Sequence, residues 1–175
     1  MGQKSDKYIN MELVIHPNKV LRQKCIEVNF DEINKSELED IGRQMLEIMY
    51  NNNGAGLAHP QVAGNSRIFV MGIENYSRII INPVIEKQSI VVEADQEGCL
   101  SFPGLWMPVK RATTILAKWI STEGRVQREF FSDFEARCFQ HELDHLDGIT
   151  FNERVSKLVL NMAMKKLRKK NKHGR

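Results

Sequence analysis

The sequence predicts an α+β fold in which mainly antiparallel strands surround a central helix, with an N-terminal amphipathic helix and a C-terminal basic helix. Two observations predict this class. Several short runs rich in β-branched residues follow one another without helical patterns between them, whereas parallel strands would need crossover helices. Helical patterns lie before and after these runs, so helices and strands are segregated along the chain.

Composition predicts one domain. The chain has 175 residues, of which 42% are hydrophobic and 27% charged, enough for one full core. Residues 1–10 are expected to be a flexible extension, residues 11–170 a single domain that includes the C-terminal helix, and residues 171–175 a basic tail. No apolar run suits a membrane span or a secretion signal. Three cysteines, an odd number, then favour free thiols in a reducing, cytoplasmic compartment.

The first helix is predicted to begin near Ser36. Ser36 and Glu39 have the spacing of a capping box, which satisfies backbone N–H groups at a helix start. Apolar residues then recur at helical spacing, namely Leu38, Ile41, Met45, Ile48 and Met49. We interpret this stripe as core packing, and we expect Asn-Asn-Asn-Gly at 51–54 to end the helix.

The segment 54–61, Gly-Ala-Gly-Leu-Ala-His-Pro-Gln, follows. It neither follows a strand pattern nor opens a helix, as a phosphate-binding loop would. Gly54 and Gly56 permit close approach of the backbone, so main-chain groups here could be presented to a ligand. Gln61 ends the segment with an amide that can donate a hydrogen bond to a developing oxyanion.

Strands are predicted over the middle of the chain. They are separated by Asn-Pro, Pro-Gly and Glu-Gly steps, and the predicted runs are 67–73, 79–81, 90–93, 113–120 and 126–131. The break Ser-Thr-Glu-Gly at 121–124 is expected to be a hairpin turn. No internal repeat or linker interrupts this region.

The central helix is predicted to run from about Asp133 to about Asp147. Ser132 and Glu135 have capping-box spacing, and Gly148 suits the position after the last turn. Apolar residues within it supply a face for packing.

This helix is also expected to bind a metal. His141 and His145 are four residues apart, so on a helix they lie on one face and about one turn apart, where both imidazoles can reach one ion. Glu142 follows the first histidine, which places a carboxylate where it can take a proton from water beside the ion. The alternative is a pair of histidines that lie on a solvated helix surface.

A metal held by two histidines needs a further protein ligand, and Cys99 is the best placed candidate. A glycine precedes it and a turn follows it. One thiolate with two imidazoles would leave a fourth position open for water. Taken alone, such a cysteine is more often a buried small apolar residue. Its neighbour Leu100 could offer a backbone N–H to the same substrate oxygen as Gln61.

The C-terminal end is strongly basic. The net charge is +3, but residues 165–175 hold seven lysines and arginines and no acidic residue, so the rest of the chain is net acidic. Such a run either meets a polyanion or is a solvated helix face.

Three segments together resemble the motifs of the peptide deformylase family, in the right order and at similar separations. They are Gly54–Gln61, Glu97–Ser101 and Gln140–His145. The resemblance covers nearly the whole chain from about Leu13 onward. Three separated motifs are a far more specific signal than any one of them.

The resemblance implies a metal-dependent enzyme that hydrolyses the N-formyl group of the initiator methionine on nascent polypeptides and releases formate. It implies metal ligands Cys99, His141 and His145; a general base and acid Glu142; oxyanion donors Gln61 and the Leu100 N–H; and substrate contacts at Gly54, Gly56, Phe134 and Cys138. For Cys138 and Phe134, plain core packing stays equally open. The metal would be Fe²⁺, with Zn²⁺, Ni²⁺ or Co²⁺ as substitutes.

Further expectations come from the same resemblance. The partners would be formyl-methionyl nascent peptides and, through the basic helix at 162–170, the ribosome, with no membrane partner. Glu97 and Arg111 would form a pair that fixes the Cys99 loop.

Two residues depart from the family pattern. The family usually has Ile or Val at Ala55, which removes bulk near the methionine pocket, and Ala at His59. We expect His59 to face solvent rather than line the cleft, and His16 and His173 to be surface residues.

Two other interpretations stay open. One is a metallopeptidase of the His-Glu-x-x-His type, although no downstream ligand is evident. The other is a ribosome- or RNA-binding module with a structural metal, which would need four protein ligands where three are found.

Overall fold

The computed structural model describes residues 11–73 and 76–173. Its helices are α1 (Lys35–Asn51), α2 (Asp133–Leu146) and α3 (Lys157–His173), with short 3₁₀ helices η1 (Lys19–Arg22), η2 (His59–Val62) and η3 (Phe151–Glu153). Its strands are β1 (Gly56–Ala58), β2 (Ile68–Ile73), β3 (Tyr76–Gln88), β4 (Val92–Gly98), β5 (Trp106–Ala112), β6 (Thr114–Ile120) and β7 (Val126–Ser132). The expected extension 1–10 lies outside the described residues, and α3 continues to His173, past the predicted start of the tail.

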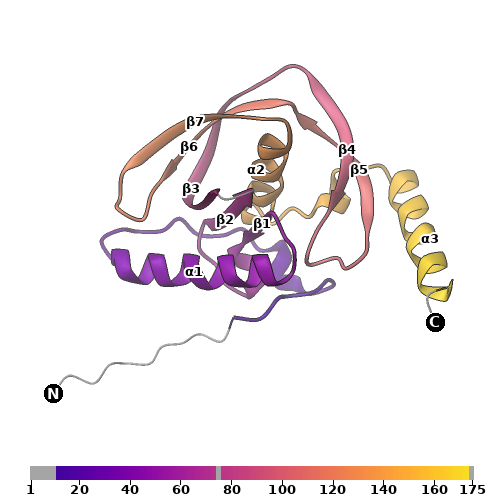
Figure 1. The fold of residues 1–175 in the computed structure, drawn as a ribbon, viewed down its shortest axis with the longest axis horizontal. Coiled ribbons are helices and arrows are strands. Elements are labelled where there is room, and N and C mark those ends of the chain that lie inside the picture. The colour runs from indigo at the N-terminus through magenta and orange to yellow at the C-terminus, as the bar shows by residue number, and fades with distance from the viewer. Residues whose placement is uncertain (1–10, 74–75, 174–175) are drawn as a thin grey trace.

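The strands form two antiparallel sheets. The larger sheet has five strands in the order β1-β2-β3-β6-β7, and the smaller pairs β4 with β5. All the named strand pairs are antiparallel. The strands curve around α2, with α1 below them and α3 beside β4 and β5 (Figure 1). The predicted α+β class with antiparallel strands around a central helix is confirmed.

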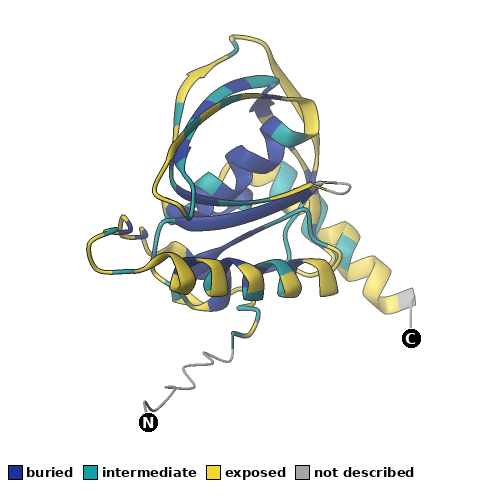
Figure 2. Cartoon of the chain, turned by 60° about the vertical axis from the view of Figure 1, so that its left-hand side comes forward, coloured by how far each residue is buried: buried dark blue, intermediate teal, exposed yellow. Residues whose placement is uncertain are grey.

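Helix α2 is enclosed by the sheets and is buried along most of its length (Figure 2). Its Phe139 packs edge-on against Phe69 of β2, with ring centroids 5.0 Å apart, and lies 5.3 Å from Phe131 of β7. Each of these rings is fully buried, and burial of such a side chain stabilises the fold by about 1.5–3 kcal/mol. The helix that carries the candidate ligands is therefore held rigidly inside the core.

Helix α1 covers the opposite face of β1 and β2. Its apolar stripe is core, as predicted: Leu38, Met45 and Met49 are each fully buried. The predicted capping box at Ser36 is wrong, because the N-cap lies two residues earlier. Asn34 is the N-cap, and its side chain accepts a hydrogen bond from the N–H of Glu37 at 3.0 Å.

The two ends of α2 are stabilised by different backbone hydrogen bonds. The C-terminal end is as predicted: Gly148 has φ 74°, its N–H donates to the carbonyl of His145, and that of Ile149 donates to Asp144. At the N-terminal end Ser132 is the N-cap but forms no side-chain capping bond. Asp133 instead adopts φ 51° and donates its N–H to the carbonyl of Thr113, so a tight turn out of β7 starts the helix.

One strand prediction was wrong because the Asn82-Pro83 step was taken as the end of a strand. β3 runs through Asn82-Pro83 as one strand, with a register shift against β6 there. Asn82 adopts φ 50°, and its side chain bonds to both the N–H and the carbonyl of Val28, at 2.8 and 2.9 Å. The strands β1 and β5 were not predicted. The hairpin turn at 121–124 is confirmed, because Gly124 has φ 76° and donates to the Ser121 carbonyl.

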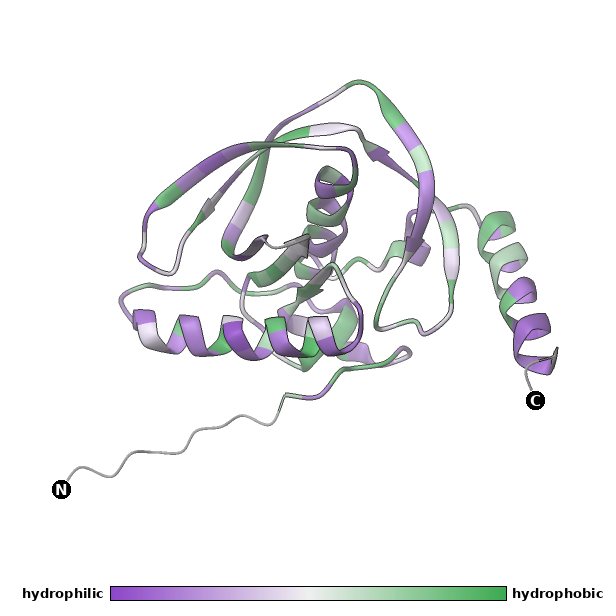
Figure 3. Cartoon of the chain, in the orientation of Figure 1, coloured by the Kyte–Doolittle hydropathy of each residue, from purple (hydrophilic) through white to green (hydrophobic). Residues whose placement is uncertain are grey.

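Helix α3 lies against β5 through one apolar face. Residues such as Val159, Ala163 and Leu167 pack on a cluster around Phe102 and Phe151. The helix is apolar in its first turns and hydrophilic toward its end (Figure 3). Within the described ranges, no helix combines the length and the apolar character that a membrane crossing requires.

Candidate active site

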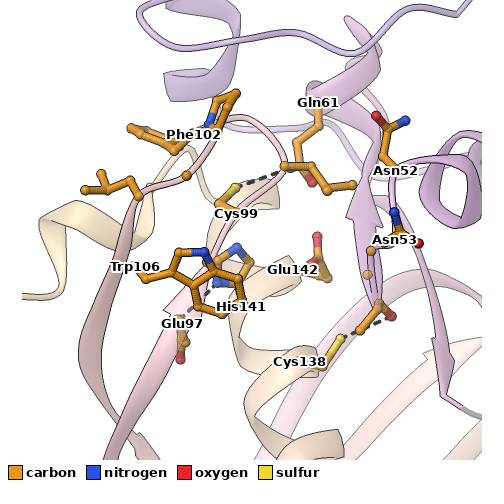
Figure 4. Close-up of a pocket in the computed structure, with 18 of the residues that line it drawn as sticks. Asn52, Asn53, Gln61, Glu97, Cys99, Phe102, Trp106, Cys138, His141 and Glu142 are labelled. Atoms are coloured by element: carbon orange, nitrogen blue, oxygen red, sulfur yellow. Dashed lines mark hydrogen bonds and ion pairs between the residues drawn. The ribbon is translucent and has the colours of Figure 1, made fainter. Parts of the chain in front are cut away.

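Residues far apart in the sequence meet beside the middle of α2. The ligand atoms of Cys99, His141 and His145 all lie within 4.8 Å of one another. Both histidines project from α2, and Cys99 directly follows β4. The Cys99 Sγ lies 3.2 Å from Nε2 of His145. The structure thus brings together the three residues that the sequence predicted as metal ligands; Figure 4 shows Cys99 and His141 in the same hollow as Gln61 and Glu142.

The two histidines have different surroundings. Burial opposes a charge on His141, but hydrogen bonds to Cys99 and Glu97 outweigh it and raise the pKa of His141 well above its ordinary value. Burial and then the nearby His141 lower the pKa of His145, so that ring is neutral. One cysteine sulfur and two imidazoles that converge in this way are a ligand set that divalent ions accept.

Glu97 orients His141. Its Oε2 lies 3.0 Å from Nδ1 of His141, which leaves Nε2 of that ring for an ion. Arg111 donates to Glu97 through Nε at 3.0 Å and through Nη2 at 3.1 Å, so the expected pair is in contact. Burial alone would raise the pKa of Glu97, but the hydrogen bonds to His141 and Arg111 outweigh it and lower that pKa to about 2. The carboxylate is therefore anionic at any ordinary pH.

Glu142 lines the cleft beside the ligands. It is 4% exposed, and its Oε2 has no hydrogen-bond partner among the residues that the structure describes. Burial raises its pKa to about 7. Gly56 leaves the room that this side chain occupies, since a Cβ at Gly56 would lie 2.4 Å from Oε1 of Glu142. A carboxyl group with a near-neutral pKa suits proton exchange at physiological pH.

Gln61 is held with its donor group toward the site. Its Oε1 accepts the N–H of Ala58 at 2.8 Å, which fixes the orientation of the amide. Its Nε2 then lies 3.5 Å from the Cys99 Sγ and 3.2 Å from the Ser101 Oγ. The amide that the sequence predicted as an oxyanion donor therefore faces Cys99, the candidate metal ligand.

A cleft of about 660 Å³ opens beside these residues. Leu100, the predicted oxyanion donor, lines it, and so do all the predicted substrate contacts, namely Gly54, Gly56, Phe134 and Cys138. Phe134 is 55% exposed and lies at the rim. Cys138 is buried, its Sγ donates to the Ala55 carbonyl at 3.5 Å, and burial raises the pKa of its thiol. It is not in the group of converging ligand atoms. Ala55 also lines the cleft. This is the position that the predicted loss of bulk near the methionine pocket requires.

The expectation that His59 faces solvent is wrong. His59 is 8% exposed, and its Nδ1 accepts the N–H of Ser66 at 3.2 Å. It packs on Gly64, where a Cβ would lie 2.0 Å from the ring, and it is not among the cleft residues. Burial lowers its pKa. His16 is exposed, as expected, and stacks on Phe102, whereas the side chain of His173 lies outside the described residues.

Sequence reasoning missed several cleft residues. Leu13 and Ile15 line the cleft from an N-terminal segment whose neighbours Val14 and His16 donate backbone hydrogen bonds to the carbonyls of Gln61 and Ser101, respectively. No sequence signal places that segment there, because the contacts are long-range. Arg137 also lines the cleft and is buried. Its position one turn before His141 was a readable signal, since residues four apart share a helix face.

A cysteine and two histidines whose ligand atoms converge, with a carboxyl group of near-neutral pKa beside them on a cleft, are the arrangement of a metal-dependent hydrolase. The family model for polypeptide deformylase matches residues 10–161 of this chain. The chain therefore belongs to the peptide deformylase family, whose members are metal-dependent amidohydrolases that remove the N-formyl group from the initiator methionine of nascent polypeptides and release formate.

Curated relatives and solved structures agree with this assignment. The peptide deformylase of Fusobacterium nucleatum is 40% identical over 149 residues, which cover 85% of both chains. That of Thermotoga maritima is 39% identical over 149 residues, covering 85% of this chain and 88% of its own. A crystal structure of a peptide deformylase from Synechococcus elongatus in complex with actinonin has a TM-score of 0.83 at 38% identity, covering 95% of this chain and 90% of that one.

A further solved structure is informative about ligands. It is a Met-Ala-Ser-bound class I type b peptide deformylase from Acinetobacter baumannii, with a TM-score of 0.79 at 30% identity, covering 83% of this chain and 98% of that one. These findings support neither the metallopeptidase nor the RNA-binding alternative.

Proposed function

We propose that this chain deformylates nascent polypeptides with an Fe²⁺ ion held by Cys99, His141 and His145, for which Zn²⁺, Ni²⁺ or Co²⁺ can substitute. The observation that carries the proposal is the convergence of these ligand atoms within 4.8 Å, beside the buried carboxyl group of Glu142. When bound, the ion would lower the pKa of a water molecule towards neutrality and polarise the formyl carbonyl.

Glu142 is the proposed proton carrier. Its pKa of about 7 lets it accept a proton from the attacking water and return it to the departing amine at neutral pH. The side chain is enclosed between α2 and β1, so it keeps one position through both transfers.

Gln61 and Leu100 are the proposed oxyanion donors. The Gln61 Nε2 already faces Cys99, and Leu100 follows Cys99 and lines the cleft. Preorganised donors of this kind act without reorganising during the reaction.

The peptide is proposed to bind along β1. This strand is at the edge of the five-stranded sheet, where an extended peptide can add as a further strand beside Gly54 and Gly56. The first side chain would then enter the cleft between Phe134 and Cys138. The binding of Met-Ala-Ser to the Acinetobacter baumannii relative supports a peptide that begins with methionine.

The test is release of a primary amine from a formyl-Met tripeptide, by protein purified without oxygen and loaded in parallel with Fe²⁺ and Zn²⁺. Turnover with Fe²⁺ that disappears in Glu142→Ala is the expected result. A folded, metal-loaded protein that releases no amine would contradict the proposal.

We further propose that residues 11–170 are one catalytic domain working in the cytoplasm, and that α3 docks on the ribosome. The exposed side of α3 carries lysines and arginines, including Lys165, Lys166 and Arg168, which suits contact with ribosomal RNA. Replacing these three with glutamate should weaken co-sedimentation with ribosomes and leave turnover of a free tripeptide unchanged. Equal co-sedimentation of the variant would remove α3 from this role.

A further inference from the structure

Arg137 is a buried cation whose hydrogen-bond acceptors all lie on β4 and β5. It is one turn before His141 on α2, and its side chain is 10% exposed. Its Nη1 donates to Oε1 of Glu97 at 2.8 Å and to the carbonyl of Val109 at 2.7 Å. Its Nη2 donates to the carbonyl of Glu93 at 2.9 Å. A guanidinium taken out of water needs this combination of an ion pair and further hydrogen bonds.

These three acceptors belong to the two-stranded sheet. Glu93 and Glu97 lie in β4, and Val109 lies in β5. This sheet is separate from the five-stranded sheet that surrounds α2. One side chain of α2 therefore connects the helix to the main chain of both strands of the smaller sheet.

The geometry of the metal site depends on that connection. Cys99 directly follows β4, whereas His141 and His145 belong to α2. The distance between the thiolate and the imidazoles is therefore set by how the β4–β5 sheet lies on the helix. Arg111 also joins this sheet to α2, but its bonds reach only the side chains of Glu97 and Asp144. Gln140 of α2 binds the backbone of the sheet as well, but at Ala112 of β5 alone. Arg137 differs from both because it binds backbone carbonyls of both strands.

We propose that Arg137 is a positioning residue that clamps the β4–β5 sheet to α2 and thereby holds Cys99 at the separation from His141 and His145 that one metal ion requires. It acts through its hydrogen bonds to Glu97 and to the two strands. The inference rests on one part of the proposed function, namely that Cys99, His141 and His145 hold the ion.

The test compares Arg137→Met with Arg137→Lys and with a matched control. Arg78→Met is the control, because Arg78 is 14% exposed and ion-paired to Glu129 but is not among the cleft residues. Affinity for Zn²⁺ and Co²⁺ is measured by competition with a chelator, and the thiolate-to-cobalt charge-transfer band reports the Cys99 bond directly. Both readings are independent of turnover, so a wild-type protein that binds metal without deformylating anything would contradict only the proposed function.

Loss of a residue that supports a metal ligand typically lowers metal affinity by about 10–100-fold. We expect a loss of this size in Arg137→Met, together with a weakened or shifted cobalt band. Arg137→Lys keeps the charge near Glu97 but cannot reach all three acceptors, so its affinity should fall between Arg137→Met and the wild type. Arg78→Met should bind both metals as the wild type does, even if it unfolds at a lower temperature. Wild-type affinity and band in a folded Arg137→Met would overturn the proposal. If that variant does not fold, wild-type behaviour of Arg137→Lys would overturn it equally.

Discussion

Replacing Gly56 with alanine should displace Glu142 and slow catalysis while leaving the metal ligands in place. The new Cβ would lie 2.4 Å from Oε1 of Glu142, 2.7 Å from its Cγ and 2.8 Å from its Cδ. Because β1 is held by its pairing with β2, the side chain of Glu142 has to move rather than the backbone of Gly56. An ordinary contact requires a shift of about 1 Å, and a misplacement of about that size costs on the order of 10²-fold in rate, or about 2.7 kcal/mol.

The assay is kcat/KM on a formyl-Met tripeptide, with bound metal measured on the same samples. The matched control is Gly42→Ala, whose Cβ would lie 2.3 Å from Cδ1 of Ile79, between α1 and β3. Both variants overpack the fold, at a cost of about 1–3 kcal/mol in stability, but only Gly56 touches Glu142. Wild-type kcat/KM in Gly56→Ala, or an equal loss in Gly42→Ala, would refute the reasoning.

Three further predictions follow from the same structure. Gln61→Leu removes one oxyanion donor and should lower kcat by about 10²–10³-fold; an unchanged kcat would show that the amide has no such role. His59 has a pKa held below its ordinary 6.5 by burial, so the unfolded chain binds a proton more readily and stability should fall as pH drops below about 6.5. Urea unfolding at several pH values should show a smaller decline in His59→Asn than in the wild type. Removing a metal present at about 100 times its Kd should cost about 2.7 kcal/mol and lower Tm by roughly 5–10 °C, a shift that Cys99→Ala should abolish.

The parts of the fold that the sequence could predict are those set by neighbouring residues. Helix α2 was predicted nearly to its ends because Gly148 supplies the left-handed residue that closes its last turn. The alignment of His141 with His145 follows from helical spacing alone. Cys99 needed a different argument: the ligand count and the family motifs pointed to it, and no local pattern could show that β4 brings it to α2.

The parts that escaped prediction depend on contacts between distant residues. Asn82 keeps β3 continuous through a proline step only because its side chain binds both backbone groups of Val28. His59 is buried because Gly64 and Ser66 accommodate its ring, which the sequence alone does not reveal. The strand β1 has three residues and owes its existence to pairing with β2. The bonds of Asn82 and the pairing of β1 join residues far apart in the sequence, and the burial of His59 depends on how the following loop folds back on it; local propensity carries no signal for either.

Helix α2 was predicted partly from an apolar face, but it does not have the separate apolar and polar faces of an amphipathic helix. It is enclosed on most sides, so polar residues are buried with the apolar ones, and each must find a partner inside the protein. Most do: Gln140, for example, bonds to both the N–H and the carbonyl of Ala112, at 3.1 and 2.9 Å. Within α2, only Glu142 Oε2 and His145 Nδ1 are buried without a partner among the described residues, and each such atom costs about 1–3 kcal/mol. The Nδ1 of His145 lies across the ring from Nε2, which faces Cys99 in the candidate metal site. Of the two atoms, the Oε2 of Glu142 belongs to a residue that lines the cleft, so there the fold gives up stability where a reacting group, rather than a neighbouring side chain, is expected to complete the bonding.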